Sequence, residues 1–550
     1  MSFCKEITET MPSNGHPDKK SLDSVDYSTT ALVGSYEAKS TIEANKTSGS
    51  ATCKDECEAS AGLSRRRHST KAEKLYDASW HGRCNTYFIK ENRDKPSVGN
   101  NNLTLDFPIS PPQPRKGEMK WVQETFKKWC KCVKVEALLE LAIQTRNSGN
   151  KCVFGQRDGG ELNYVFTIRF DDGVEWIAKC PRRLGDNKEE EKKRLQSVEV
   201  EIGSLMFLQE VGGIPSPKIY GFGPDTRNPS RTPYIFMEKL RGVPLGHAIR
   251  NKDLERSSIY RCLDGLADFR KKLREVRFQV AASLRIYAKD NEECEWSIED
   301  LVSPLFVQSY GVKWQTSTYD TGLQYYLAQH TLSSVTASIY WELPDMEERW
   351  IVHSHIGALI PFFVQKYYVR VDGAGQDLEF EEVFLLAHLD LNDENILVDP
   401  KTGELTGIID WEYASTLPLQ AVEHYPKFLI SEKHVDDMIW LIEEKWEGVD
   451  GKAEIQSWRK YYNKHFEDDR EISWMNARIE AIELFERMIM DWVECHNFTH
   501  FHKVVKALEE SGMLPKDLKM PWDYLERMVD ARKPPQTPLA ETPTSEKLEL

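Results

Sequence analysis

The stretch AHLDLNDENILVDPKTGELTGIIDWE, residues 387–412, decides the fold. It reads as a polar loop, a short apolar strand, a turn at PKTG and a second apolar strand that ends at Asp410. A hairpin of this kind folds Asp410 back toward Asn395. Together with Asp390, two carboxylates and an amide then converge, and such oxygen ligands suit Mg²⁺ and leave coordination positions for phosphate. The alternative is that Asp390 and Asn395 only cap the loop.

The chain upstream of this stretch reads as a small β-rich lobe with one major helix. Apolar periodicity and turn residues predict these elements in order: a helix over 121–142, a hairpin with strands at 164–170 and 174–179, a charged helix over 188–210, and strands at 218–220 and 234–237. The aspartates and glycine at 171–173 supply the hairpin turn.

From Asp253 onward the pattern is mainly helical, with an amphipathic helix predicted over 261–284. The exception is the pair of strands near 395–410. These patterns predict an α+β fold, in which a small β-rich N-lobe precedes a larger, mostly helical C-lobe.

Composition predicts the domain boundaries. The first Trp is Trp80, and the chain before it is rich in Ser, Thr, Lys and Glu, which cannot bury enough apolar area to fold. We expect the following division: a disordered tail over 1–75, an extension or linker over 76–118, the opening helix and N-lobe over 119–240, the C-lobe over 241–532, and a disordered tail over 533–550.

Charge and hydropathy restrict the partners and the compartment. The 550 residues hold 72 Lys and Arg against 88 Asp and Glu, a net charge of −16, which argues against a protein that coats nucleic acid. No apolar run approaches the roughly 20 residues of a membrane helix, and the N-terminus shows no secretory signal. The 11 cysteines include no CxxC pair, as expected for reduced thiols in the cytoplasm. The oligomeric state stays open.

The loop and hairpin resemble the catalytic and metal-binding loops of the aminoglycoside phosphotransferase/choline kinase family. The wording NILVDPKTGELTGIIDWEYA is especially similar to the family's fungal phosphotransferase-domain branch. This resemblance implies a bilobal, protein-kinase-like fold. It also implies that Asp390 is the catalytic base and that Asn395 and Asp410 hold Mg²⁺. His388 would support the loop, and Glu412 is a candidate for a supporting role nearby.

The same resemblance makes expectations upstream. A kinase of this type needs a strand lysine on the phosphates of ATP and a helix glutamate that orients it. Lys179, at the end of the hairpin, stands where that lysine belongs. Glu201 is the expected partner because of its spacing to Pro215, and Glu199 is the competing choice.

Two further segments would complete the nucleotide site in this resemblance. Backbone groups from Glu238 to Leu240 would hydrogen-bond adenine. Gly159 and Gly160 would expose backbone N–H groups to the phosphates, although a plain glycine turn explains them equally well. A P-loop is disfavoured because the lysine and hydroxyl that follow its second glycine are absent.

These observations predict an ATP- and Mg²⁺-dependent phosphotransferase that moves the γ-phosphoryl group to a hydroxyl of a small molecule. The main alternative is a pseudokinase or interaction module that binds nucleotide without turnover, suggested by the glycine loop and by Leu389. A protein kinase is disfavoured because D-F-G and A-P-E are missing. The acceptor stays open among aminoglycosides, choline-like amines, sugars and peptides.

Overall fold

The computed structural model describes residues 74–76, 81–83, 113–114, 120–159, 162–182, 188–251, 253–288, 294–303, 317–337, 346–371, 377–379, 382–422, 424–430, 432–490 and 498–514. All of them belong to one unit, Thr70–Leu550. The predicted tails, 1–75 and 533–550, lie almost wholly outside these residues, so the domain boundaries stay predictions.

A six-stranded sheet forms the N-lobe. Its strands, in spatial order, are β3 (Gln113–Pro114), β4 (Cys152–Gly159), β5 (Asn163–Phe170), β6 (Glu175–Pro181), β8 (Tyr234–Glu238) and β7 (Ile219–Gly223). The predicted β5–β6 hairpin is confirmed, and its turn ends at Gly173, whose φ of +85° suits glycine. Alternate residues of β5 are buried, which gives the sheet an apolar inner face.

Two helices cover this sheet where one was predicted over 121–142. They are α1 (Lys120–Trp129) and α2 (Ala137–Arg146). Trp129 packs on Tyr164 of β5, with ring centroids 4.9 Å apart. Beyond it the backbone N–H of Lys134 donates to the carbonyl oxygen of Ser230 at 2.8 Å. This long-range hydrogen bond turns the chain, so the single-helix prediction was wrong.

A second sheet carries seven strands and was not predicted. In spatial order they are β1 (Lys74–Tyr76), β10 (Val276–Phe278), β15 (Phe384–Ala387), β18 (Ser415–Pro418), β11 (Ala282–Ala288), β12 (Cys294–Glu299) and β2 (His81–Arg83). The helix predicted over 261–284 ends at Arg274, as α5 (Ile259–Arg274). The chain then becomes β10 and β11 because β11 pairs with β18, whose Thr416 lies opposite Ala282. A local pattern cannot show a pairing at that separation.

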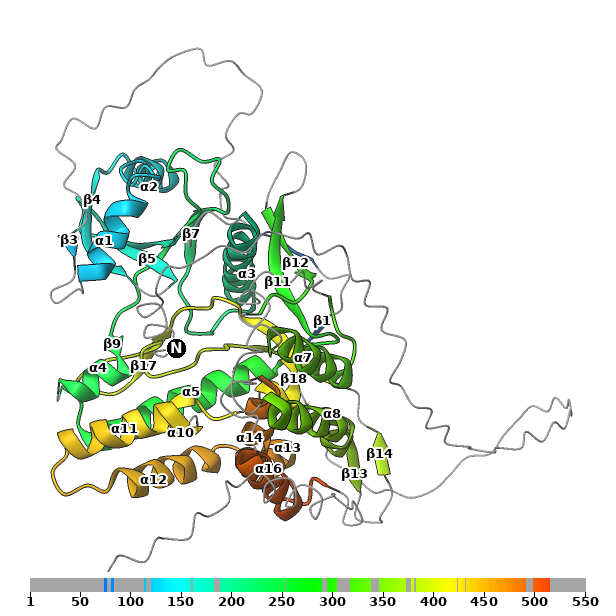
Figure 1. Ribbon diagram of the computed structural model, residues 1–550. Helices are drawn as coiled ribbons and strands as arrows, with labels where there is room; N and C mark the ends of the chain where they lie inside the picture. The colour runs from blue at the N-terminus through cyan, green and yellow to red at the C-terminus, as the bar shows by residue number, and fades with distance from the viewer. Residues whose placement is uncertain are drawn as a thin grey trace, which may run out of the picture. The chain divides into compact units, whose positions relative to one another are not determined.

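Helix α3 (Lys188–Val211) confirms the predicted charged helix and runs beside β11 (Figure 1). Its predicted apolar stripe is buried: Ile202, Leu205, Met206 and Leu208. These side chains belong to the large core shared with α5 and the seven-stranded sheet, whereas α1, α2 and β4–β6 form a separate core. The apolar side of helix α3 is therefore packed on the second sheet, although in sequence the helix lies between strands β6 and β7 of the first.

The predicted hairpin near 395–410 is confirmed in a three-stranded sheet of order β17-β16-β9. Its strands are β9 (Val243–Pro244), β16 (Ile396–Val398) and β17 (Leu405–Ile408). The turn between β16 and β17 contains Gly403, with φ +75°. A Cβ there would lie 2.1 Å from the carbonyl oxygen of Ser258, so glycine lets the turn pack against the start of α5.

The remaining described elements are mostly helices and complete the C-lobe. They are α4 (Leu245–Arg250), the 3-10 turn η2 (Arg256–Ser258), α7 (Gly322–Ala337), α8 (Met346–Tyr368), the pair β13 (Val369–Val371) and β14 (Asp377–Glu379), α9 (Leu419–Val422), α10 (Lys427–Ile430), α11 (Glu432–Lys445), α12 (Gly451–Lys464), α13 (Arg470–Asn476), α14 (Ile479–Met490) and α16 (Phe498–Glu510). The predicted α+β fold, with a small β-rich lobe and a larger, mostly helical lobe, is confirmed.

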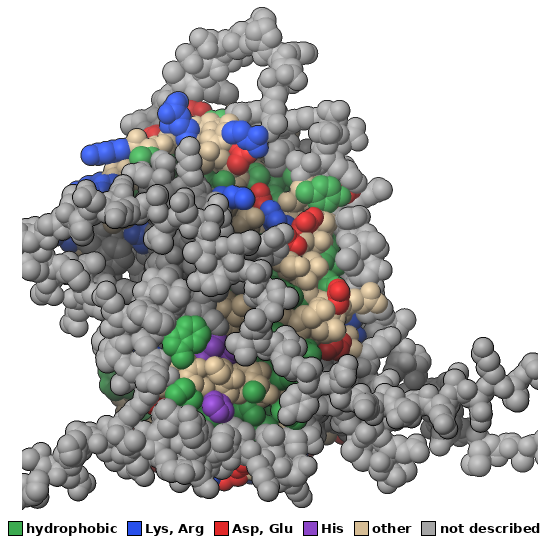
Figure 2. Space-filling model, turned by 45° about the vertical axis from the view of Figure 1, so that its right-hand side comes forward, with side chains coloured by type: hydrophobic (Ala, Val, Ile, Leu, Met, Phe, Trp, Pro, Cys, Tyr) green, Lys and Arg blue, Asp and Glu red, His purple; other side chains and the backbone are tan. Residues whose placement is uncertain are grey.

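The surface carries both signs of charge. On the face drawn in Figure 2, described Lys and Arg side chains gather toward the top, and acidic side chains lie among and below them. Among the described residues, no helix combines the length and apolar character needed to cross a bilayer.

Candidate active site

Asp390 lies in the loop between β15 and β16, and two neighbouring side chains hold its carboxyl group. Asn395 donates from Nδ2 to the Asp390 carbonyl oxygen at 2.8 Å and to Oδ2 at 3.1 Å. Lys427 donates from Nζ to Oδ1 at 2.9 Å. The Asp390 side chain is 48% exposed, so its carboxylate can still receive a solute from solvent.

His388 braces this loop against the end of β17. Its Nδ1 accepts from the backbone N–H of Asp390 at 3.2 Å, and its Nε2 lies 2.9 Å from the carbonyl oxygen of Ile409. We assign the ring proton to Nε2, since Nδ1 accepts. Burial lowers the pKa of His388 and favours the neutral ring that these bonds require. The contacts are those of a structural support between Asp390 and the residue before Asp410.

Asp410 follows β17 in an unusual backbone conformation. The backbone N–H of Ile409 donates to the carbonyl oxygen of Asn395 at 3.0 Å, so the hairpin returns Asp410 to the neighbourhood of Asn395. The φ of Asp410 is 66°, in the left-handed region that costs a non-glycine residue about 1–3 kcal/mol. Such a conformation persists only where surrounding contacts hold it, and it is common at functional sites.

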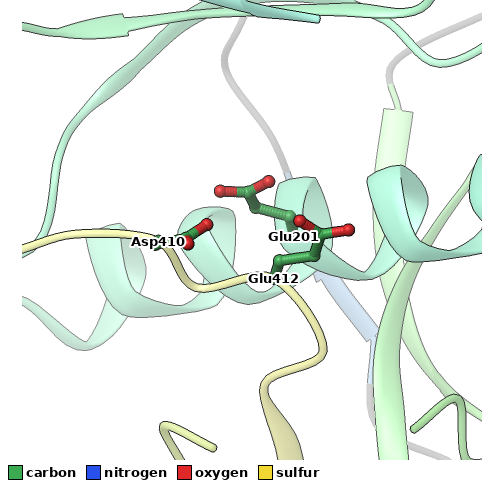
Figure 3. A group of neighbouring side chains, drawn as sticks. All are labelled: Glu201, Asp410 and Glu412. Atoms are coloured by element: carbon green, nitrogen blue, oxygen red, sulfur yellow. The ribbon is translucent and has the colours of Figure 1, made fainter. Parts of the chain in front are cut away.

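Lys179 connects the two lobes through carboxylates. Its Nζ lies 2.8 and 2.7 Å from the two carboxyl oxygens of Glu201 on α3 and 2.6 Å from Oδ1 of Asp410. Oε2 of Glu412 is 3.8 Å away. Figure 3 shows these three acidic side chains gathered between α3 and the loop after β17. The structure thus brings together Lys179, Glu201 and Asp410, while Glu199 pairs with Arg285 of β11 at 2.6 Å.

Burial and charge oppose each other in this cluster. Burial disfavours the ammonium, but Asp410, Glu201 and Glu412 outweigh it, so the pKa of Lys179 lies above its ordinary value. Lys179 lowers the pKa of Asp410 against the effect of burial. Burial raises the pKa of Glu201, and the neighbouring carboxylates add to the rise against the pull of Lys179. Lys179 is therefore a charged anchor for the acidic groups around it.

Glu412 is held by two upstream elements, β5 and α3. Asn163, the first residue of β5, donates from Nδ2 to Glu412 Oε2 at 2.7 Å. Ser197 of α3 donates from Oγ to Glu412 Oε1 at 3.1 Å. The Glu412 side chain is only 8% exposed. Its two oxygens therefore tie the loop after β17 to the N-lobe sheet and to the helix that carries Glu201.

The donor atoms fit a divalent cation. Carboxyl oxygens of Glu201, Asp410 and Glu412 lie within 4.8 Å of one another. Three carboxylates face one ammonium, that of Lys179, which leaves a formal excess of two negative charges. Asn395, whose carbonyl oxygen accepts from the residue before Asp410, offers an amide oxygen as well, and carboxylate and amide oxygens are the hard ligands that Mg²⁺ prefers when phosphate supplies the rest. Asp410 is the most open of the three acids, with 41% of its side chain exposed.

The other residues predicted to contact the nucleotide lie in the N-lobe sheet or outside the described residues. Gly159 is the last residue of β4 and pairs with Tyr164, and Gly160 lies outside the described residues. Glu238 ends β8, and its backbone N–H donates to the carbonyl oxygen of Lys218 at 2.7 Å. The backbone N–H of Glu238, which belongs to the predicted adenine-binding segment, is therefore already used in a hydrogen bond within the protein.

Leu240 packs against the hairpin that carries Asp410. A Cβ built on Gly407 of β17 would lie 2.4 Å from Cδ1 of Leu240. The segment that joins the lobes is thereby in contact with the strand that leads to Asp410.

No sequence pattern points to Lys427, Asn163 or Ser197 as part of the site. Lys427 is separated from Asp390 by 37 positions, and Asn163 from Glu412 by 249. No short motif links residues at such separations. Glu412 in the sequence could have indicated that such donors exist, because a buried glutamate needs hydrogen-bond donors.

Part of this chain is similar to known proteins. Residues 154–420 match the phosphotransferase enzyme family. A subtelomeric hrmA-associated cluster protein of Aspergillus fumigatus is 24% identical over 321 residues, which is 49% of this chain and 59% of that protein. This chain therefore spans less than two thirds of that relative.

Two further similarities are more limited. The altered inheritance of mitochondria protein 9, mitochondrial, of Kluyveromyces lactis is 26% identical over 145 residues, covering 25% of this chain and 23% of that protein. Among solved structures, a putative fructosamine-3-kinase from Thermobifida fusca aligns over 69% of this chain and all of its own, at 11% identity and a TM-score of 0.36.

Proposed function

We propose that this chain, whose residues 154–420 match the phosphotransferase enzyme family, transfers the γ-phosphoryl group of ATP to a hydroxyl of a small molecule. The observation that carries the proposal is the position of Lys179. It bonds Glu201 and Asp410 simultaneously, and His388 joins Asp410's strand to the loop of Asp390. A kinase-type phosphoryl-transfer site needs a lysine paired with a helix glutamate and a carboxylate that holds Mg²⁺.

Each side chain has a distinct task in this reaction. Lys179, oriented by Glu201, binds phosphate oxygens of ATP. Asp390 receives the proton of the acceptor hydroxyl. A bond forms between the acceptor oxygen and the γ-phosphorus, the bond from that phosphorus to the β,γ-bridging oxygen breaks, and ADP leaves. Most of the rate enhancement then comes from positioning and from neutralised charge.

Asn395 and Asp410 would hold Mg²⁺ in this proposal. When bound, the ion supplies positive charge to the phosphate oxygens. The excess negative charge around Lys179 and the partial exposure of Asp410 support this assignment. When ATP binds, its phosphates would contact the ammonium of Lys179, because that group is the cation of the described cluster.

The rest of the nucleotide would use the segment between the lobes. We assign adenine to the backbone from Glu238 to Leu240, using groups other than the N–H of Glu238, which donates to Lys218. Gly159 and Gly160 would lie over the phosphates. We expect the protein in the cytoplasm, acting on a small molecule, with neither nucleic acid nor membrane as partner.

The test is an ATP-consumption screen over hydroxylated metabolites, with Asp390→Asn as the diagnostic variant. We expect this variant to lose roughly 10²–10⁴-fold in turnover, the usual contribution of a general base, while it still binds ATP with Mg²⁺. Asp437→Asn, an exposed position of α11, is the matched control and should keep full turnover.

Two results would count against the proposal. Full turnover by Asp390→Asn would remove the base assignment. A wild-type protein that binds ATP but shows no turnover with any acceptor would favour the nucleotide-binding pseudokinase instead.

A further inference from the structure

Lys427 touches the active-site loop at two points. Its ammonium donates to Oδ1 of Asp390 at 2.9 Å, and its backbone N–H donates to the carbonyl oxygen of Leu391 at 2.9 Å. The two side chains are 39% and 48% exposed, so solutes can reach the pair from solvent. Lys427 itself lies beyond residue 420, where the match to the phosphotransferase family ends.

The element that carries Lys427 is firmly anchored. Helix α10 is only four residues long, but Phe428, Leu429 and Ile430 are all buried in the main core. Arg459 of α12 also donates from Nε to the carbonyl oxygen of Leu429 at 2.5 Å. The backbone of Lys427 is therefore fixed, and the lysine side chain extends from a rigid base.

Asp390 is consequently held from both sides. Lys427 bonds Oδ1, and Asn395 bonds Oδ2 at 3.1 Å. An ionised carboxylate has about four lone-pair sites, so two bonds fix its plane and still leave sites for an acceptor hydroxyl. Fixing a reacting group in this way is worth a large factor in rate, because a displacement of about 1 Å can cost about 10²-fold.

The charge of Lys427 matters as well as its hydrogen bond. His388 accepts from the backbone N–H of Asp390, and its Nε2 lies 2.9 Å from the carbonyl oxygen of Ile409, the residue before Asp410, so the base shares its surroundings with a second carboxylate. His388 is neutral in its bonded form and Asn395 carries no charge. Of the side chains bonded to Asp390 in the described structure, Lys427 is the one that brings positive charge.

We propose that Lys427 is a positioning residue for phosphoryl transfer: its ammonium holds the Asp390 carboxylate in the orientation that meets the acceptor hydroxyl. This inference rests on the proposed function. It assigns a role to a residue outside the family match, supplied by a separate helix. Because Lys427 acts through Asp390, its removal should affect the transfer step and leave ATP binding intact.

The experiment compares Lys427→Met and Lys427→Arg with the wild type in steady-state kinetics, using an acceptor found in the screen. We expect Lys427→Met to lower kcat by about 10–100-fold with an unchanged KM for ATP. Lys427→Arg should recover most of the loss, since it restores a cation and a donor. Lys445→Met is the matched control, because Lys445 also pairs with a carboxylate, Glu444 at 2.8 Å, on α11 away from Asp390.

A purely structural role would give a different pattern. Lys427→Met with normal kcat overturns the inference, and so does a loss of kcat that Lys427→Arg does not recover. A lower thermal midpoint in Lys427→Met, with equal damage in Lys427→Arg, would also overturn it. The wild type is assayed first. If it shows no turnover, the proposed function and this inference are both overturned; if it does, the variants test this inference alone.

Discussion

Replacing Gly203 by alanine tests the contact on which α3 depends. A Cβ at this position would lie 2.4 Å from the carbonyl oxygen of Leu284 in β11, 2.8 Å from its carbonyl carbon and 3.0 Å from that of Arg285. All three are backbone atoms of a strand paired on both sides, so they cannot rotate away as a side chain would. Helix α3 would have to move off the sheet.

The size of the effect follows from these distances. An ordinary contact between carbon and a carbonyl oxygen is about 3.3 Å or more, so α3 and β11 must separate by about 1 Å. Overpacking of this kind costs up to about 3 kcal/mol. Alanine recovers about 1 kcal/mol, because glycine is a poor residue inside a helix. We therefore expect Gly203→Ala to lose about 2 kcal/mol of unfolding free energy.

Urea unfolding measures this loss, as a lower midpoint at an unchanged slope. The control is Gln209→Ala on the exposed side of α3, which should stay within about 0.5 kcal/mol of the wild type. Glu201 lies two residues before Gly203, so the displaced helix should also weaken the Lys179–Glu201 pair and raise the KM for ATP.

An unchanged or higher stability of Gly203→Ala would refute this reasoning. Alanine is the better helix former, so a gain of stability is the natural result if α3 does not press on β11. That outcome would show that the close approach of helix and strand is not under constraint.

Two further predictions concern buried ion pairs. Lys179→Met should destabilise the fold by about 3–5 kcal/mol, because Glu201, with 4% of its side chain exposed, loses its cation; a urea-measured loss below about 1 kcal/mol would contradict this. His424 lies 2.7 Å from Glu486; burial opposes its charge, but the carboxylate outweighs burial and raises its pKa. The pair therefore stabilises the fold fully below about pH 6.5, the unfolded value, and loses this effect as pH rises through the raised pKa. The thermal midpoint of the wild type should exceed that of His424→Asn by less and less as pH rises from 5.5 to about 9. A difference between the two midpoints that stays constant over this range would refute the prediction.

Much of the site was predictable because its residues follow strong local patterns. Asp390 and Asn395 share one loop, and the turn at PKTG forces Asp410 back beside them through the hairpin, as the bond from Ile409 to Asn395 shows. Lys179 stands at the end of a hairpin with a clear turn, and Glu201 stands on an amphipathic helix. Local spacing is sufficient in each case, since the contacts that shape these segments are short in sequence.

The second sheet was not predictable in the same way. Strands β10 and β11 continue an amphipathic pattern that reads as helix, and pairing partners from 384–387 and 415–418 decide otherwise. The break between α1 and α2 has a similar origin, in the bond from Lys134 to Ser230. Competition between local preference and distant pairing is settled by the energy of the assembled core.

The sequence by itself determined the kind of site: a loop and hairpin that carry Asp390, Asn395 and Asp410, in a chain with an upstream lysine. Only the tertiary structure decided which groups hold these residues in place. It paired Lys179 with Glu201, the partner that the spacing to Pro215 predicted, gave Glu199 to Arg285, and brought Lys427 to Asp390. The physical reason is that motif spacing records contacts made within a few residues, whereas the orientation of a buried charge depends on every element packed around it.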